Sequence, residues 1–199
     1  NVVIFGGTGK IGISFSKILS SFGARVFLLD LNSSKNKIKK GVTFIKCDVS
    51  NEKEIQNKLN LIIKKYKKID TMIYNVYSKP NNYYQNFENY KSETWKKVLE
   101  TNLTGAFFSS QFLIKHFKKK KIKGNLIFLL STYGIVGPNY KIYEGLKNKK
   151  NIYGGNFSLN TPASYTTTKS ALLGLMKYIS TNFGKYGIRS NTLTPGGVY

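Results

Sequence analysis

The 199-residue sequence has little sulfur and no long apolar run. Its one cysteine, Cys47, excludes an internal disulfide, and its place beside a strand-like run predicts a buried thiol. No apolar segment approaches the roughly 20 residues of a membrane-spanning helix, and no secretory signal is apparent. These absences disfavour a membrane protein or a disulfide-built secreted domain. They favour a cytoplasmic protein with one domain over residues 1–199.

Acidic residues and arginine are also scarce. There are 9 acidic against 32 basic residues, for a formal charge of +23, and all the basic residues except Arg25 and Arg189 are lysines. Specific recognition of bases and phosphates relies strongly on arginine forks. We therefore interpret the charge as a solvated lysine surface with a codon bias, and do not expect nucleic acid as a partner. A basic, non-catalytic scaffold that binds nucleic acid is the remote alternative.

Short apolar runs alternate with segments of helical periodicity. Apolar spacing of three and four predicts helices around residues 11–22, 55–63, 95–113 and 171–179. Strand–helix alternation predicts an α/β, doubly wound, Rossmann-type three-layer sandwich with ligands at the carboxyl ends of parallel strands. Residues 137–162 lack a period and are interpreted as an inserted surface flap. The predicted strands are Val2–Phe5, Arg25–Leu29, Val42–Ile45, Thr71–Tyr74, Asn125–Leu130 and Ile188–Leu193.

A glycine-rich turn follows the first strand, with glycines at positions 6, 9 and 12. At a strand-to-helix turn, this spacing lets backbone N–H groups and the helix N-terminus approach a pyrophosphate. The predicted cofactor contacts from this turn are Gly6, Thr8, Gly9, Lys10, Ile11 and Gly12.

An acidic residue, Asp30, ends the second strand. A carboxylate there accepts hydrogen bonds from ribose hydroxyls and repels a 2′-phosphate, so NAD is expected in preference to NADP. Two features leave alternatives open: Lys35 could help to hold a phosphate, and Asp30 could simply cap the next helix.

Tyr165 and Lys169 form the strongest candidate for catalysis. Their four-residue spacing places both side chains on one helix face. A free tyrosine has a pKa near 10, and an adjacent ammonium favours the phenolate and should lower that pKa. The pair could then exchange a proton with a substrate hydroxyl or carbonyl.

Five further motifs occur in an order that resembles the short-chain dehydrogenase/reductase family. Together with the glycine-rich turn and Tyr165–Lys169, they cover the chain from end to end. They are Asn102–Gly105 for N-x-x-G, Ser131–Gly134 for S-x-x-G, Pro195-Gly196 after the last strand, Asp48-Val49 for the D-V pair, and residues 74–77 in the place of N-N-A-G, with Asn75 kept.

The resemblance implies a role for each motif. Ser131 would bind the reacting oxygen, Asn102 would support a water relay to Lys169, and Lys169 would also hold the nicotinamide ribose. The other implied cofactor contacts are Asp48, Val49, Asn75, Tyr165, Pro195, Gly196 and Val198. No metal is expected.

The resemblance also carries expectations about architecture. It implies a sheet in the order 3-2-1-4-5-6, and a homodimer or homotetramer paired through the long helices. Because the substrate-covering loop and a seventh strand of the family are not found before Tyr199, the chain is interpreted as a fragment that lacks its C-terminal part.

Several departures from the family pattern concern the reaction. The glycine spacing is closer to the extended branch of the family, so a sugar-nucleotide epimerase or dehydratase that retains its NAD is the alternative. Tyr74 and Tyr77 replace an Asn and a Gly of N-N-A-G, which should narrow the opening there. Residues 137–162 lengthen the Ser131–Tyr165 spacing; a similar insertion marks family members of surface-glycan and flagellin-sugar pathways.

From these features we expect hydride transfer between NAD(H) and a secondary alcohol or carbonyl, on a small, polar, sugar-like substrate. The flap would contact that substrate, although a solvent flap or subunit contact fits the sequence equally well.

Overall fold

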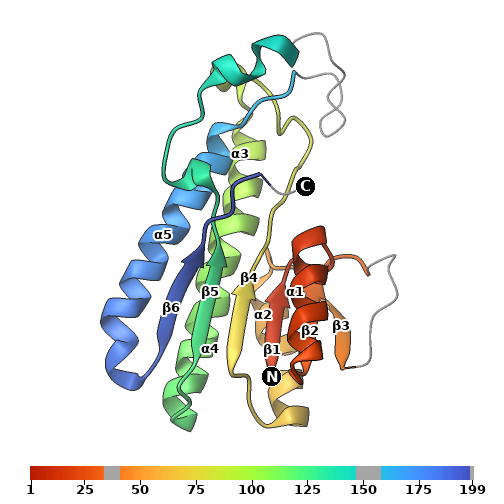
Figure 1. The fold of residues 1–199 in the computed structure, drawn as a ribbon, viewed down its shortest axis with the longest axis vertical. Coiled ribbons are helices and arrows are strands. Elements are labelled where there is room, and N and C mark those ends of the chain that lie inside the picture. Colours follow the sequence, from red (N-terminus) through yellow and green to blue (C-terminus); the bar gives the residue numbers. More distant parts are fainter. Residues whose placement is uncertain (34–40, 147–157, 198–199) are drawn as a thin grey trace.

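The computed structural model describes residues 1–33, 41–146 and 158–197. These residues form a six-stranded parallel sheet in the order β3-β2-β1-β4-β5-β6, which confirms the predicted topology (Figure 1). The bounds of β1 and β4 are as predicted. Those of β2, β3, β5 and β6 differ from the prediction by one residue at one or both ends. The strands are β1 (Val2–Phe5), β2 (Val26–Asp30), β3 (Val42–Lys46), β4 (Thr71–Tyr74), β5 (Asn125–Leu129) and β6 (Arg189–Leu193).

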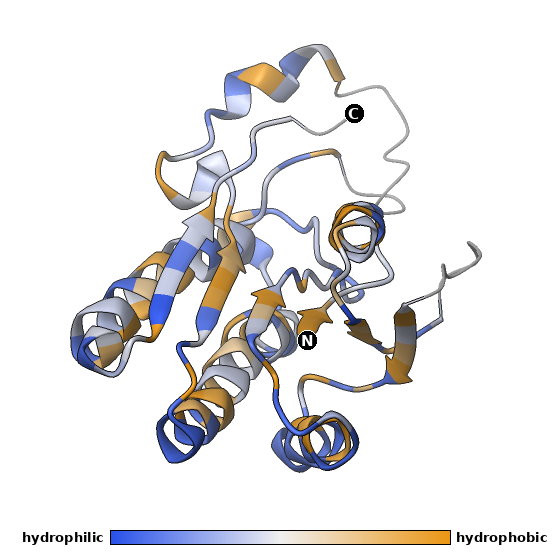
Figure 2. Cartoon of the chain, turned by 60° about the horizontal axis from the view of Figure 1, so that its bottom comes forward, coloured by the Kyte–Doolittle hydropathy of each residue, from blue (hydrophilic) through white to orange (hydrophobic). Residues whose placement is uncertain are grey.

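Helices cover both faces of this sheet, but unequally. One face packs on α2, α4 and α5, and its core includes Phe5, Phe27 and Phe128. The opposite face packs on α1 through Ile4, Leu28 and other buried side chains. Successive residues of β1 and β2 thus enter opposite cores, which explains why these strands are apolar throughout. In Figure 2 the central strands are mostly apolar, whereas β6 is largely polar.

The α-helices lie where the apolar periodicity predicts them. They are α1 (Lys10–Ser21), α2 (Glu52–Tyr66), α3 (Ser92–Leu99), α4 (Gly105–Lys120) and α5 (Ala163–Phe183). A π-helical segment, η2 (Glu100–Thr104), joins α3 to α4, so the predicted long helix is continuous but locally widened. The short helices are η1 (Phe87–Asn89), η3 (Thr132–Gly134), η4 (Tyr140–Leu146) and η5 (Gly184–Tyr186).

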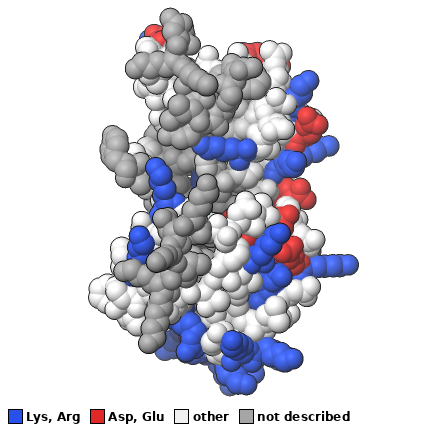
Figure 3. Space-filling model, turned by 90° about the vertical axis from the view of Figure 1, so that its right-hand side faces the viewer, with Lys and Arg blue, Asp and Glu red and all other residues white. Residues whose placement is uncertain are grey.

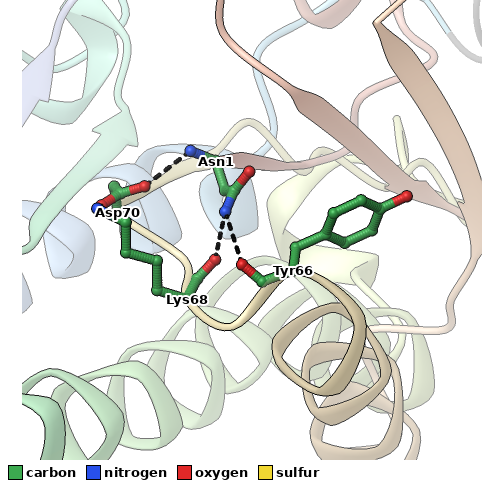
Figure 4. Close-up of polar contacts among 4 residues, drawn as sticks. All are labelled: Asn1, Tyr66, Lys68 and Asp70. Atoms are coloured by element: carbon green, nitrogen blue, oxygen red, sulfur yellow. Dashed lines mark hydrogen bonds and ion pairs between the residues drawn. The ribbon is translucent and has the colours of Figure 1, made fainter.

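Asn1, which precedes β1, forms hydrogen bonds and an ion pair with the connection between α2 and β4 (Figure 4). The Asn1 side-chain amide donates to the carbonyls of Lys68 at 2.7 Å and Tyr66 at 3.4 Å. The α-amino group of Asn1 forms an ion pair with Asp70 at 2.7 Å, and Lys68 reaches the same carboxylate at 2.8 Å. Asp70 precedes β4, the strand that pairs with β1, so these contacts support that pairing.

Basic side chains are prominent on the surface. On the face shown in Figure 3, lysines gather at the base, and acidic residues mix with lysines along one edge. The last turns of α2 and α4 carry lysines, where cations complement the helix dipole. None of the described helices combines the length and apolar character that crossing a bilayer requires.

Two helical glycines should respond in opposite ways to alanine. A Cβ at Gly105 would lie 2.5 Å from the Tyr74 hydroxyl and 2.6 Å from the Val49 carbonyl, whereas one at Gly174 meets nothing within 4 Å. We predict that Gly105→Ala lowers the free energy of unfolding by about 1–3 kcal/mol through overpacking. Gly174→Ala should raise it by about 1 kcal/mol through helix propensity. Urea unfolding of both variants checks this, and equal effects would contradict the packing account.

Candidate active site

A wide cleft lies at the carboxyl ends of β1, β2, β3 and β4. Its volume is about 1080 Å³, and the glycine-rich turn forms one wall. Parallel α/β sheets bind ligands at this position. Nine of the predicted cofactor contacts line it: Gly6, Thr8, Gly9, Lys10, Ile11, Asp30, Asp48, Val49 and Asn75.

The glycines of the turn serve different purposes. Gly6 has a φ of +68°, and a Cβ there would lie 2.7 Å from the Asn75 carbonyl. A Cβ at Gly12 would lie 2.6 Å from the Gly7 carbonyl, so Gly12 is a packing residue and does not line the cleft. At Gly9 the nearest atom to a Cβ would be 3.7 Å away. Packing therefore does not demand glycine at position 9, and its open side faces the cleft.

The polar groups around the turn hold its shape. Asn75 follows β4 and donates from its side-chain amide to the Gly6 carbonyl at 2.9 Å. Asp30 accepts from the Thr8 N–H at 3.1 Å and from the Leu31 N–H at 2.8 Å. Asp48 accepts from the Ser50 N–H and hydroxyl at 2.9 and 2.7 Å. Both carboxylates keep lone pairs available to the cleft.

A second cavity, of about 390 Å³, lies beside the first. Ser131, Tyr165 and Gly196 line it, so the structure brings together three predicted residues from the connection between β5 and η3, from α5 and from the segment after β6. The Pro195 carbonyl accepts from the Thr132 hydroxyl at 3.4 Å, which ties that last segment to the Ser131 loop. Val198, the remaining predicted contact, lies outside the described residues.

Lys169 lies beneath this cavity, one helical turn after Tyr165. Its side chain is 4% exposed, and its ammonium donates to the Leu129 carbonyl at 2.6 Å. The Nζ atom is 5.8 Å from the centre of the Tyr165 ring. Burial lowers the pKa of Lys169 from its ordinary 10.5 to about 8.

The pKa of Tyr165 departs from the prediction. Burial raises it, the hydrogen bond with the Ser131 side chain opposes the rise, and the nearby Tyr143 phenol adds to it. The expected lowering by Lys169 is therefore not found. The physical reason is that the Lys169 ammonium binds the Leu129 carbonyl instead of the phenol.

The π-helical segment positions Asn102. This residue is fully buried, and its Oδ1 accepts from the Ser78 N–H at 3.1 Å. Among the described residues no hydrogen-bond partner is found for its Nδ2. The Tyr74 hydroxyl donates to the Thr101 carbonyl at 2.6 Å, within the π-helical segment. Such segments are common at functional sites.

The flap returns to the sheet beside the second cavity. Asn160, Thr161 and Pro162 line the cavity at the point of return. The Tyr143 hydroxyl in η4 hydrogen-bonds the Thr161 side chain, and that of Tyr140 donates to the Thr161 carbonyl. Lys35 and residues 147–157 of the flap lie outside the described residues.

Sequence reasoning missed several cavity residues. Lys79 and Lys97 line the cleft, and Tyr84 and Tyr133 line the second cavity. Lys79, Lys97 and Tyr84 belong to no motif, and Tyr133 occupies a variable position of the S-x-x-G motif, so no sequence signal marked them. Cys47 is 1% exposed, and burial raises the pKa of its thiol to about 12, which confirms the expected buried thiol.

The fold and the two cavities define a Rossmann-type α/β protein, and comparison with known proteins gives the family. The model of the family "short chain dehydrogenase" matches residues 1–147. The chain belongs to the short-chain dehydrogenase family. It is 28% identical to short-chain dehydrogenase reductase 3a of Arabidopsis thaliana, over 98% of this chain and 70% of the relative. It is 22% identical to bovine (Bos taurus) L-fucose dehydrogenase, over 100% of this chain and 66% of the relative.

Solved structures agree with the fold. A short-chain dehydrogenase from Leptospira borgpetersenii, solved with bound NAD+, superimposes with a TM-score of 0.86 at 28% identity, over 100% of this chain and 71% of that one. An NAD+-bound xylitol dehydrogenase gives a TM-score of 0.77 at 21% identity, over 100% of this chain and 71% of that one, which supports the fold alone.

The burial of Lys169 gives a testable stability effect. Its pKa falls from 10.5 to about 8, so the native state binds fewer protons than the unfolded chain between these pH values, and stability from this group rises with pH there. Below pH 8 the buried charge of Lys169 lowers the free energy of unfolding by on the order of 3 kcal/mol. Lys169→Met removes this cost but leaves the Leu129 carbonyl unpaired, which costs about 1–3 kcal/mol. We predict that the variant is about 1–2 kcal/mol more stable at pH 7.

Urea unfolding between pH 7 and pH 10 checks this prediction. The advantage of Lys169→Met should shrink as the pH rises above 8. Lys177→Met, an exposed position on the same helix, should stay within about 0.5 kcal/mol of the unaltered protein throughout. A Lys169→Met variant whose stability difference does not change with pH would contradict the account.

Proposed function

We propose that the protein is an NAD-dependent dehydrogenase that interconverts a secondary alcohol and its carbonyl on a small, sugar-like substrate. The observation that carries this proposal is the second cavity, where Ser131 and Tyr165 lie together above the buried Lys169, next to the dinucleotide-sized cleft. The cytoplasm is the compartment proposed for it.

The residues of the cleft fit NAD. The open side of Gly9 leaves room for a pyrophosphate at the N-terminus of α1, where Lys10 adds a positive charge. Asp30 at the end of β2 would accept from ribose hydroxyls, and its charge disfavours the 2′-phosphate of NADP. Asp48 and Val49 would contact the adenine. The L. borgpetersenii enzyme, solved with NAD+, supports this choice of cofactor.

The catalytic work of the chain is proton transfer and orientation. The nicotinamide, when bound, accepts or supplies the hydride. In the oxidation direction, Tyr165 as phenolate takes the proton of the alcohol, and Ser131 orients the alcohol oxygen by hydrogen bonding. Burial raises the pKa of Tyr165, so the phenolate needs a cation nearby. A small shift of the Lys169 ammonium from the Leu129 carbonyl toward the phenol would supply it. The unpartnered Asn102 amide suits a water relay to Lys169.

A polar, hydroxyl-bearing substrate suits the second cavity. Its rim carries the Thr161 and Asn160 side chains from the flap and the phenols of Tyr84 and Tyr133. These groups can donate to and accept from several hydroxyls, and aromatic rings can cover an apolar sugar face. The similarity to L-fucose dehydrogenases, at 22% and 24% identity, supports the same substrate class. The flap would then contact the substrate.

A homodimer or homotetramer is part of the proposal. Phe107 on α4 and Tyr178 on α5 are 45% and 62% exposed. Pairing of subunits through α4 and α5 would cover these two side chains.

Replacing the catalytic phenol tests the mechanism. We predict that Tyr165→Phe lowers kcat at least 100-fold with aldoses or polyols, because proton transfer of this kind contributes about 10²–10⁴-fold. The affinity for NADH should change less than threefold. Stopped-flow NADH absorbance and fluorescence titration measure the two effects. Retained turnover in Tyr165→Phe would contradict the assignment.

The same assay separates the epimerase or dehydratase alternative. A dehydrogenase forms free NADH in proportion to the substrate that it oxidises. An enzyme that retains its NAD converts substrate with no net NADH. Detection of an epimerised or dehydrated sugar without NADH would favour the alternative.

Gly9→Ala tests the position of the cofactor. Because a Cβ at Gly9 meets no atom closer than 3.7 Å, the free energy of unfolding should change by less than about 1 kcal/mol. The methyl group would still occupy the open side of the turn, so we predict at least tenfold weaker binding of NADH, which costs about 1.4 kcal/mol. Isothermal titration calorimetry measures it. Gly184→Ala, also in open space, is the control, and unchanged affinity in Gly9→Ala would place the pyrophosphate elsewhere.

A further inference from the structure

Tyr77 lies at the junction of the two cavities. It lines both the cleft and the second cavity. It follows Val76 in the loop after β4, at the position where the family motif has glycine. A ligand that extends from the glycine-rich turn to Tyr165 must therefore pass the Tyr77 side chain.

The ring of Tyr77 is held between other aromatic rings. It meets the Tyr165 ring edge-on, with the centroids 5.1 Å apart and an interplanar angle of 68°. On another side it meets the buried Tyr83 ring at 5.8 Å and 75°. Tyr77 is nevertheless 42% exposed. The Lys79 ammonium also lies 5.2 Å from the centre of the Tyr77 ring. A ring held by the buried Tyr83 and the partly buried Tyr165 that still lines a cavity is preorganised for contact with a ligand.

We propose that Tyr77 is a positioning residue that contacts the nicotinamide end of the cofactor and holds it beside Tyr165. The inference rests on the proposed function, since it requires NAD in the cleft. A glycine at this position offers no side-chain surface. The tyrosine adds an aromatic ring that lines both cavities. Aromatic pairs prefer offset or edge-on geometries, which the exposed part of this ring can offer to a nicotinamide.

A pair of ligands isolates this contribution. NADH carries the nicotinamide, and ADP-ribose is the same molecule without it. Fluorescence and calorimetric titrations give both dissociation constants for the unaltered protein, Tyr77→Ala and Tyr77→Phe. We expect Tyr77→Ala to weaken NADH about tenfold while ADP-ribose stays within twofold. Tyr77→Phe, which keeps the ring, should stay within twofold for both ligands.

A control separates this role from a general effect on the fold. Tyr186 is 43% exposed, close to the 42% of Tyr77, and lines neither cavity. Tyr186→Ala should leave both dissociation constants unchanged.

Three outcomes would overturn the inference. Two unchanged dissociation constants in Tyr77→Ala would exclude the contact, and parallel weakening of both ligands would show that Tyr77 only supports the loop. Tighter NADH binding would show that the ring obstructs the passage. In each case the proposed function stands, because the unaltered protein binds both ligands. If the unaltered protein binds neither, the cofactor assignment itself fails, and this inference fails with it.

Discussion

The buried ammonium of Lys169 is the constraint on which the candidate site depends. A charge with 4% exposure needs a strong acceptor, and the Leu129 carbonyl at the end of β5 supplies it at 2.6 Å. To bring the ammonium there, α5 must pack closely on η3. Gly134 permits this approach, because a Cβ at that position would lie 3.0 Å from Lys169 atoms. The Ser170 hydroxyl bonds the Gly134 carbonyl at 2.9 Å and fixes the same contact.

That docking explains why the candidate catalytic residues meet although they are distant in sequence. Ser131 immediately precedes η3, and Tyr165 lies one helical turn before Lys169 on the same helix. Once α5 rests on η3, the phenol and the serine hydroxyl must face one another, however long the chain between them is. The flap of residues 137–162 can therefore lengthen the connection without moving the pair. Its C-terminal end, at Asn160, Thr161 and Pro162, lines the same cavity.

The sequence predicted the fold well, and most of its candidate site residues line the two cavities, because both follow from local patterns. Apolar strands, helical periodicity and glycine spacing are short-range features, and the four-residue spacing of Tyr165 and Lys169 fixes a shared helix face. The pKa of Tyr165 could not be predicted in this way. Spacing does not show how deeply a phenol is buried or which acceptor an ammonium finds. Likewise, nothing local distinguishes the π-helical segment at residues 100–104 from ordinary helix, since its cause lies in tertiary contacts.

Tyr74 departs from the family pattern, and its contacts explain how that departure is tolerated. Tyr74 fills the space that Gly105 leaves, and its hydroxyl satisfies the Thr101 carbonyl beside the π-helical segment. The Tyr74 side chain thus requires a residue without a side chain at position 105 and an acceptor for its hydroxyl, and Gly105 and the Thr101 carbonyl meet these two requirements. Tyr77 and the flap border the second cavity, whereas Asp30, Asp48 and Asn75 on the cleft side follow the pattern. The carboxylates and the amide that line the cleft thus follow the family pattern, whereas the glycine spacing of the turn, the Tyr77 ring and the flap depart from it.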